Sequence, residues 1–104
     1  MKRIDVIMSC CKDIARHISC IEAELAGEKQ NADRYIECKQ MLIKYYLDQS
    51  GDYREINRTL QRLIGSVADL DDNAANKQDL RDRLLCILIY TAMMEDARNE
   101  INNQ

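Results

Sequence analysis

The sequence predicts an all-α protein, a compact antiparallel bundle of about four helices that forms a single domain over residues 1–104. Three observations lead to this prediction. The chain has no proline and only three glycines, and its apolar residues, 46% of the total, include neither Phe nor Trp, a composition that suits helices. Apolar residues recur at steps of three and four. Glycines or polar clusters separate the segments that carry this rhythm.

The first segment carries the most regular pattern in the chain. Its three successive heptads form an apolar seam of Ile4, Ile7, Cys11, Ile14, Ile18, Ile21 and Leu25. Gly27 is the expected end of this helix, because a residue without Cβ readily adopts the left-handed conformation that terminates helices. The rhythm can also continue through Ala32 and Tyr35, which leaves a single long helix over residues 3–49 as the alternative.

A second helix is expected over residues 31–49. Its apolar residues span a wider arc than a coiled-coil seam, which predicts neighbours on more than one side. They are Tyr35, Ile36, Cys38, Leu42, Ile43, Tyr45, Tyr46 and Leu47. Gly51 is suited to the end of this helix, and Asp52 to the N-cap of the next.

The third helix repeats the spacing of the first. Its seam consists of Tyr53, Ile56, Leu60, Leu63, Val67 and Leu70, with Ile64 beside it. A short acidic stretch over residues 69–79 follows, and it offers several Asp and Asn side chains that can cap a fourth helix. The boundary between the third and fourth helices is therefore expected in this stretch.

The fourth helix, expected over about residues 75–101, has apolar residues on two opposite sides. Eleven uncharged positions follow one another from Leu84 to Met94. They span about 16 Å as a helix, against roughly 30 Å of hydrocarbon in a bilayer, so we expect no membrane crossing. One stripe, expected to face inward, comprises Leu80, Leu84, Ile87, Thr91 and Met94; the opposite one comprises Leu85, Ile89 and Met93, joined by Cys86.

The second stripe of the fourth helix is the first candidate for a functional surface. A helix that is apolar all round is normally a buried helix, whereas each helix of a four-helix monomer keeps one face in water. The stripe is therefore expected to meet an additional element, which would be a long loop, a second copy of the chain in a homodimer, or another protein. We predict that the chain binds a partner through Leu85, Cys86, Ile89 and Met93, together with Arg54, Arg58 and Arg62 of the third helix.

A row of polar side chains on the outer side of the third helix is the second candidate surface. It consists of Arg54, Asn57, Arg58, Gln61 and Arg62. These residue types read bases and phosphates, and a helix that follows a tight turn is how recognition helices reach DNA. A small DNA-binding transcriptional regulator that uses Arg54, Asn57, Arg58 and Arg62 is therefore the alternative function. The net charge of −3, with its signs interleaved along the chain, disfavours nucleic acid, and arginines serve equally well as anchors for a protein partner.

One stripe of the first helix carries histidine, cysteine and aspartate side chains that could bind a metal ion. His17 shares one helical stripe with Cys10, Asp13 and Cys20, and imidazole with thiolate suits zinc. On a straight helix Cys10 and Cys20 are about 15 Å apart, so only neighbouring pairs could share an ion. Free cysteines usually pack as small hydrophobic residues. With no Gly-rich phosphate loop and no Glu-x-x-His pair, we predict no metal, no cofactor and no enzymatic activity.

These features favour a non-enzymatic module for protein–protein interaction. Five cysteines, an odd number, together with the lack of a secretory signal, predict reduced thiols in the cytoplasm. Inhibitors, immunity proteins and secretion chaperones, often bacterial or phage proteins, share this size and acidity. We therefore expect a protein that masks or regulates another protein, with a homodimer as the simplest assembly.

Overall fold

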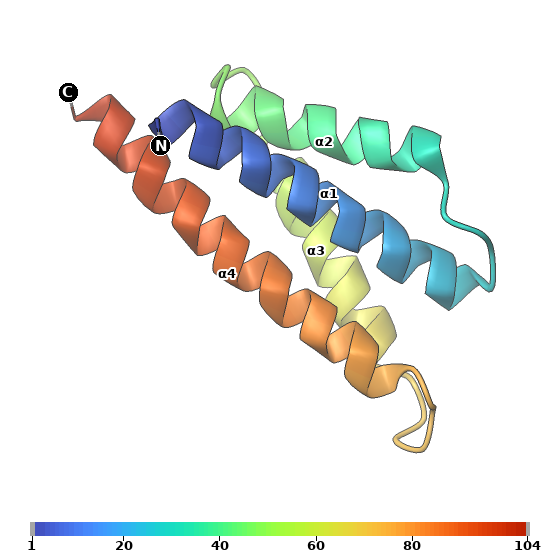
Figure 1. The fold of residues 1–104 in the computed structure, drawn as a ribbon. Helices are drawn as coiled ribbons and strands as arrows, with labels where there is room; N and C mark the ends of the chain where they lie inside the picture. Colours follow the sequence, from blue (N-terminus) through green and yellow to red (C-terminus); the bar gives the residue numbers. More distant parts are fainter. Residues whose placement is uncertain (1, 104) are drawn as a thin grey trace.

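The computed structural model describes residues 2–103, and over this range the chain forms four helices (Figure 1). They are α1 (Arg3–Ala26), α2 (Ala32–Tyr46), α3 (Tyr53–Ala68) and α4 (Lys77–Asn102). Each helix runs antiparallel to the one before it, and the beginning of α1 lies beside the end of α4 in a bundle of 49 × 25 × 24 Å. The predicted all-α, antiparallel four-helix bundle is therefore confirmed.

The break between α1 and α2 decides between one long helix and two. Gly27 adopts a left-handed conformation with φ of 66°. The amide groups of Gly27 and Glu28 donate to the carbonyls of Glu24 and Ala23, which satisfies the open carbonyls of the last turn. The Asn31 side chain then caps α2 by accepting from two backbone amides. Residues 3–49 thus form two helices, and α1 ends where the glycine predicts.

The turn between α2 and α3 differs in detail from the prediction. Helix α2 ends at Tyr46, and the residue in the left-handed conformation is Gln49, with φ of 55°, rather than Gly51. A Cβ atom at Gly51 would lie 2.9 Å from the backbone nitrogen of Tyr45. The glycine is therefore needed because two stretches of backbone approach each other closely, and not because of its φ angle.

Helix α1 occupies the centre of the bundle. It contacts the other three helices and packs most closely against α2 and α4. Its buried residues cover much of its circumference; they are Ile7, Cys10, Cys11, Ile14, Ala15, Ile18, Ser19 and Ile21. Helix α4 buries fewer, namely Lys77, Leu80, Ile87, Met94 and Ala97. Helix α1 therefore has the larger buried face, while α4 lies at the periphery with its outer side open.

A buried lysine fixes the start of α4 against the end of α3. The Lys77 ammonium group donates to the carbonyl oxygens of Leu70, at 2.6 Å, and Ala68, at 3.4 Å. It also pairs with the Asp72 carboxylate at 2.9 Å. A cation at the C-terminus of a helix interacts favourably with the helix dipole. This contact satisfies the last carbonyls of α3 and sets the angle at which α4 leaves the loop.

Candidate interaction surface

A continuous apolar surface covers the outer side of α4. Four large side chains on it are about half exposed or more: Leu85 at 57%, Leu88 at 50%, Ile89 at 60% and Met93 at 45%. Ala92, between them, is also exposed. We call these five residues the α4 face. Their spacing of three and four places all of them on one side of the helix.

Nothing within the described chain covers the α4 face. The opposite side of the helix packs into the core through Leu80, Ile87 and Met94. The three interhelical loops lie at the ends of the bundle and do not cross the middle of α4 (Figure 1). Three elements were expected to be able to pack on this surface: a long loop, a second copy of the chain, or another protein. Within residues 2–103 the long loop is excluded. A second copy of the chain and another protein remain.

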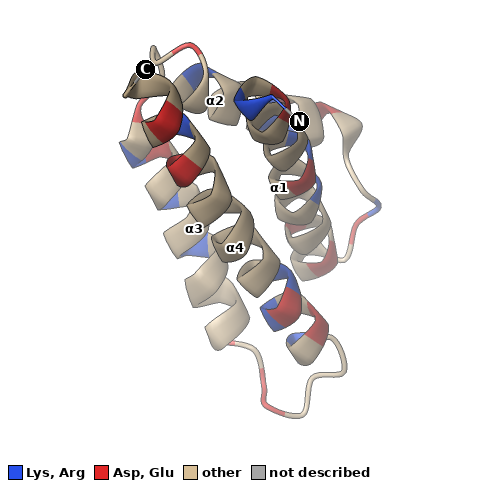
Figure 2. Ribbon diagram, turned by 60° about the vertical axis from the view of Figure 1, so that its left-hand side comes forward, with Lys and Arg blue, Asp and Glu red and all other residues tan. Residues whose placement is uncertain are grey.

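Charged residues bound the α4 face at both ends. Figure 2 shows an uncharged middle stretch of α4 between charged turns near its beginning and its end. Arg81 and Asp82 precede the face, and Asp96 follows it; all three are exposed. Within residues 2–103 no helix combines the length and apolarity that a membrane crossing requires. The α4 face is thus a short apolar strip framed by charge.

The α4 face extends to the beginning of α1. Met93 lines a shallow pocket of about 250 Å³ together with Arg3 and Val6 of α1. Asp96 and Glu100 line the same pocket, and Glu100 forms an ion pair with Arg3. The edge of the face is therefore polar on the side of α1, as is typical of the rim of a protein interface.

The sequence prediction identified most of this surface but not all of it. Leu85, Ile89 and Met93 lie on the exposed side as expected. Cys86 is only partly exposed and lies at the edge next to Met93 on a helical wheel. The prediction did not include Leu88, because Leu88 lies outside the i, i+4 series of Leu85, Ile89 and Met93. The uncharged run from Leu84 to Met94 does contain it.

The arginine row on α3 is largely occupied by carboxylates of the chain itself. The Arg54 guanidinium lies 3.2 Å from Asp52, whose side chain also accepts from the Arg54 backbone amide. These hydrogen bonds lower the pKa of Asp52. Arg62 lies 2.9 Å from Glu22 of α1. Among the described residues only Arg58 of the three has no ion pair within 4 Å, and it lines a shallow pocket with Arg54 and Asn57.

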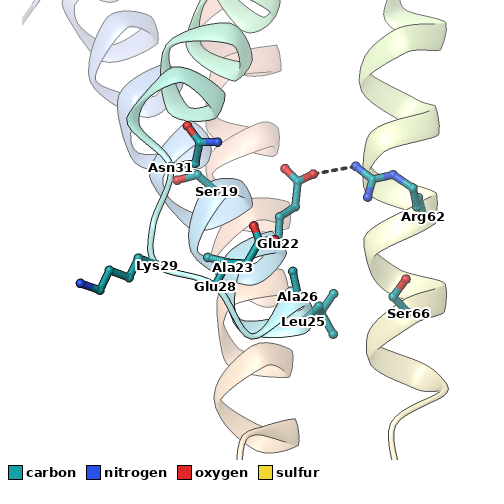
Figure 3. A pocket seen from close by; sticks show the side chains of 10 residues that line it. All are labelled: Ser19, Glu22, Ala23, Leu25, Ala26, Glu28, Lys29, Asn31, Arg62 and Ser66. Carbon is teal, nitrogen blue, oxygen red and sulfur yellow. Dashed lines mark hydrogen bonds and ion pairs between the residues drawn. The ribbon is translucent and has the colours of Figure 1, made fainter.

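Glu22 joins three helices, which the sequence alone did not suggest. One of its carboxylate oxygens accepts from Arg34 of α2 at 2.9 Å, and the other accepts from Arg62 of α3 at 2.9 Å. Figure 3 shows Glu22 reaching towards Arg62 across a cleft of about 430 Å³ near the end of α1. Lys29 and Ser66 line the same cleft. Arg62 is therefore engaged in holding α3 against α1.

The cysteines and the histidine do not converge. Cys10, Cys11 and Cys38 are buried thiols, and Cys20 and Cys86 are partly exposed. Burial raises the pKa of Cys11 to about 12 and that of Cys38 to about 11. Within residues 2–103 no three His, Cys, Asp or Glu side chains lie where they could hold a metal ion together.

His17 bridges α1 and α4 instead of facing a cysteine cluster. Its ring stacks on Tyr90, with centroids 6.3 Å apart, and its Nδ1 lies 3.3 Å from the Arg83 guanidinium. Because guanidinium only donates, Nδ1 accepts and the ring is neutral. Burial, and then the charge of Arg83, lower the pKa of His17.

No protein-family model, curated protein or solved structure matches this chain.

Proposed function

We propose that this chain is a non-enzymatic interaction protein that binds a partner protein through the α4 face and thereby masks or regulates it. The observation that carries the proposal is the exposure of Leu85, Leu88, Ile89 and Met93 on one side of a helix. Large contiguous apolar patches are rare on monomeric proteins and often mark interaction sites. Their spacing also matches the anchors of an apolar helix that docks into a partner's groove.

The two most deeply buried thiols, Cys11 and Cys38, are poorly suited to act as nucleophiles. A cysteine nucleophile acts as a thiolate, whereas the raised pKa values of Cys11 and Cys38, about 12 and about 11, keep both protonated at neutral pH. We place the protein in the cytoplasm, where thiols remain reduced. An inhibitor, an immunity protein or a chaperone is the type of binding protein we propose.

The DNA-binding alternative has less support. A DNA-binding surface gains affinity from cations that are free to meet phosphates. Arg54 is paired with Asp52, and Arg62 with Glu22, so part of the positive charge of the row is already balanced by carboxylates of the chain. Among the described residues, Arg58 is the one arginine of the row with no ion pair within 4 Å, so the row carries little uncompensated charge to attract a duplex.

The test is a comparison of two variants that each add one negative charge. Ile89→Asp places it in the α4 face, and Gln40→Asp places it on the exposed side of α2, away from both candidate surfaces. Because both sites are exposed, we expect both variants to fold and to unfold at about the temperature of the wild type. Affinity purification from the source cells, followed by mass spectrometry, should recover partners with the wild type and Gln40→Asp that are lost with Ile89→Asp.

Two outcomes would contradict the proposal. Equal recovery of partners by Ile89→Asp and the wild type would remove the α4 face from the binding site. A salt-sensitive shift of duplex DNA that Arg58→Ala abolishes would favour the regulator instead.

A further inference from the structure

We infer that His17 forms a proton-sensitive contact between α1 and α4, in which protonation of the imidazole ring releases Arg83 and leaves it paired with Asp79 alone. This inference goes beyond the proposed function and does not depend on it. It describes a conformational device inside the bundle, and it rests on the groups that face one another where the two longest helices meet.

The Arg83 guanidinium and the imidazole ring are compatible only while the ring is neutral. Nη1 of Arg83 lies 3.3 Å from Nδ1 of His17, and a guanidinium group has donors but no acceptor. The proton of the neutral ring is therefore on Nε2, and Nδ1 accepts. A protonated ring carries an N–H group at both nitrogens, so it presents a donor and a positive charge to Arg83. Protonation thus turns this hydrogen bond into a repulsive contact.

Arg83 has a second partner that it keeps when it leaves the ring. Its Nε atom lies 3.4 Å from a carboxylate oxygen of Asp79, one turn earlier in α4. The Arg83 side chain is 32% exposed and that of Asp79 is 58% exposed. A guanidinium group that turns towards Asp79 therefore moves into solvent and not into the core. The rearrangement requires no change in the packing of the buried residues.

The imidazole ring also keeps a partner when it is protonated. It stacks on the Tyr90 ring, with centroids 6.3 Å apart, and this contact requires no particular protonation state. Tyr90 lies seven residues after Arg83, on the same side of α4. Protonation should therefore remove the contact with Arg83 and preserve the one with Tyr90.

The charges around the ring determine when the exchange occurs. Burial, and then the charge of Arg83, lower the pKa of His17. Asp13 of α1 and Asp79 of α4 act in the opposite direction, while Arg16 of α1 also lowers the pKa. Because the pKa of the ring lies below its ordinary value of about 6.5, the ring is neutral at pH 7 and the contact with Arg83 is formed. It is lost as the pH falls through the pKa of the folded chain.

The first test is an NMR titration of the folded full-length chain from about pH 8 to about pH 4. The chain has one histidine, so its ring signals are unambiguous. At neutral pH, nuclear Overhauser effects should connect the ring proton between the two nitrogens with the Arg83 side chain, and the ring with Tyr90. As the ring signals move to their protonated positions, the effect to Arg83 should be lost and the effect to Tyr90 should remain.

The second test uses variants that should move the titration midpoint of His17 in opposite directions. Arg83→Gln removes the cation beside Nδ1 and should raise the midpoint. Asp79→Asn removes a carboxylate that favours the protonated ring and should lower it. Arg81→Gln is the matched control, because it makes the same change at an exposed position two residues away, and it should titrate as the wild type does. Thermal unfolding at about pH 8 checks that each variant is folded.

Three results would overturn the inference. An Overhauser effect between His17 and Arg83 that persists in the protonated ring means that the contact does not respond to the proton. Loss of the effect to Tyr90 together with that to Arg83 means that the whole ring leaves α4 and no partner is exchanged. Equal shifts in Arg81→Gln and Arg83→Gln mean that the ring responds to the net charge of the chain. None of these results bears on the α4 face, so the proposed function is tested separately.

Discussion

Helices α1 and α4 are the two longest in the bundle and lie antiparallel to each other, yet their environments differ. Both carry apolar residues over a wide arc. In α1 that arc is covered beyond the first turn, with Ile7, Ile14 and Ile18 at 1% exposure or less. Ile4, in the first turn, is exposed. In α4 the outer half of the arc is open, and Ile89 is 60% exposed. Apolar composition alone therefore does not tell which helix a bundle surrounds.

The difference follows from where each helix lies. Helix α1 has small side chains such as Ala15 and Ser19 among its buried residues, and small residues let neighbouring helices approach. Helices α2 and α4 pack closely on it and α3 also contacts it, while Ser9, Lys12 and Arg16 on its remaining side are exposed. Helix α4 has no neighbour on its outer side. The comparison shows that the same kind of residue stabilises the fold in α1 and is available for binding in α4.

The largest effect expected from this comparison is on stability. Ile18→Ala removes a fully buried side chain from the centre of the bundle and should lower the free energy of unfolding by about 2–5 kcal/mol. Ile89→Ala makes the same chemical change on the α4 face and should alter it by less than about 0.5 kcal/mol in the monomer. Urea unfolding at low micromolar concentration measures both. Similar losses for the two variants would mean that Ile89 belongs to the core.

The next effect is on thiol accessibility. Cys11 is buried, 3.6 Å from the Met94 sulfur, and its pKa is raised to about 12 by burial. Cys86, at the edge of the α4 face, is partly exposed. Under native conditions Cys11 should be alkylated roughly 100-fold more slowly than Cys86 or slower still, because it reacts only after the helices separate.

Peptide mapping by mass spectrometry after timed alkylation resolves the two sites, since they fall in different tryptic peptides. In denaturant the difference in rate should collapse. Equal native rates would show that α1 and α4 separate readily and that α1 is not the protected centre.

The smallest effect is the pH dependence of the contact between α1 and α4 at His17. Because the pKa of His17 is lower in the folded chain, the unfolded chain binds a proton first as the pH falls through about 6.5. The contribution of neutral His17 to the free energy of unfolding should therefore be fully present above this pH. It should decline as the pH drops below it and level off below the folded-state pKa.

His17→Asn provides the control for this titration, since carboxylates also titrate in acid. The difference in unfolding free energy between the wild type and His17→Asn should change in favour of the wild type as the pH rises from about 5 to about 7. A difference that is independent of pH, or that changes in the opposite direction, would contradict the placement of His17 beside Arg83.

Much of this molecule is predictable from local sequence signals. Gly27 and the polar segments near residues 50 and 70 mark the helix boundaries to within a few residues, because capping and the left-handed conformation depend on neighbours in the chain. The two-sided character of α4 is also readable from its spacing. The role of Glu22 between Arg34 and Arg62 was not, because exposed charges on three helices give no sign of which of them will meet.

The amino-acid sequence by itself determined that the chain is helical, where most of its helices approximately begin and end, and which residues share a side of each helix, since these depend on interactions between residues a few positions apart. Only the tertiary structure decided that α1 is the surrounded helix, that α4 keeps its second side open, and that Arg54 and Arg62 are held by carboxylates of the chain. These outcomes depend on how four amphipathic helices share one core, which is a property of their mutual packing and not of any single segment.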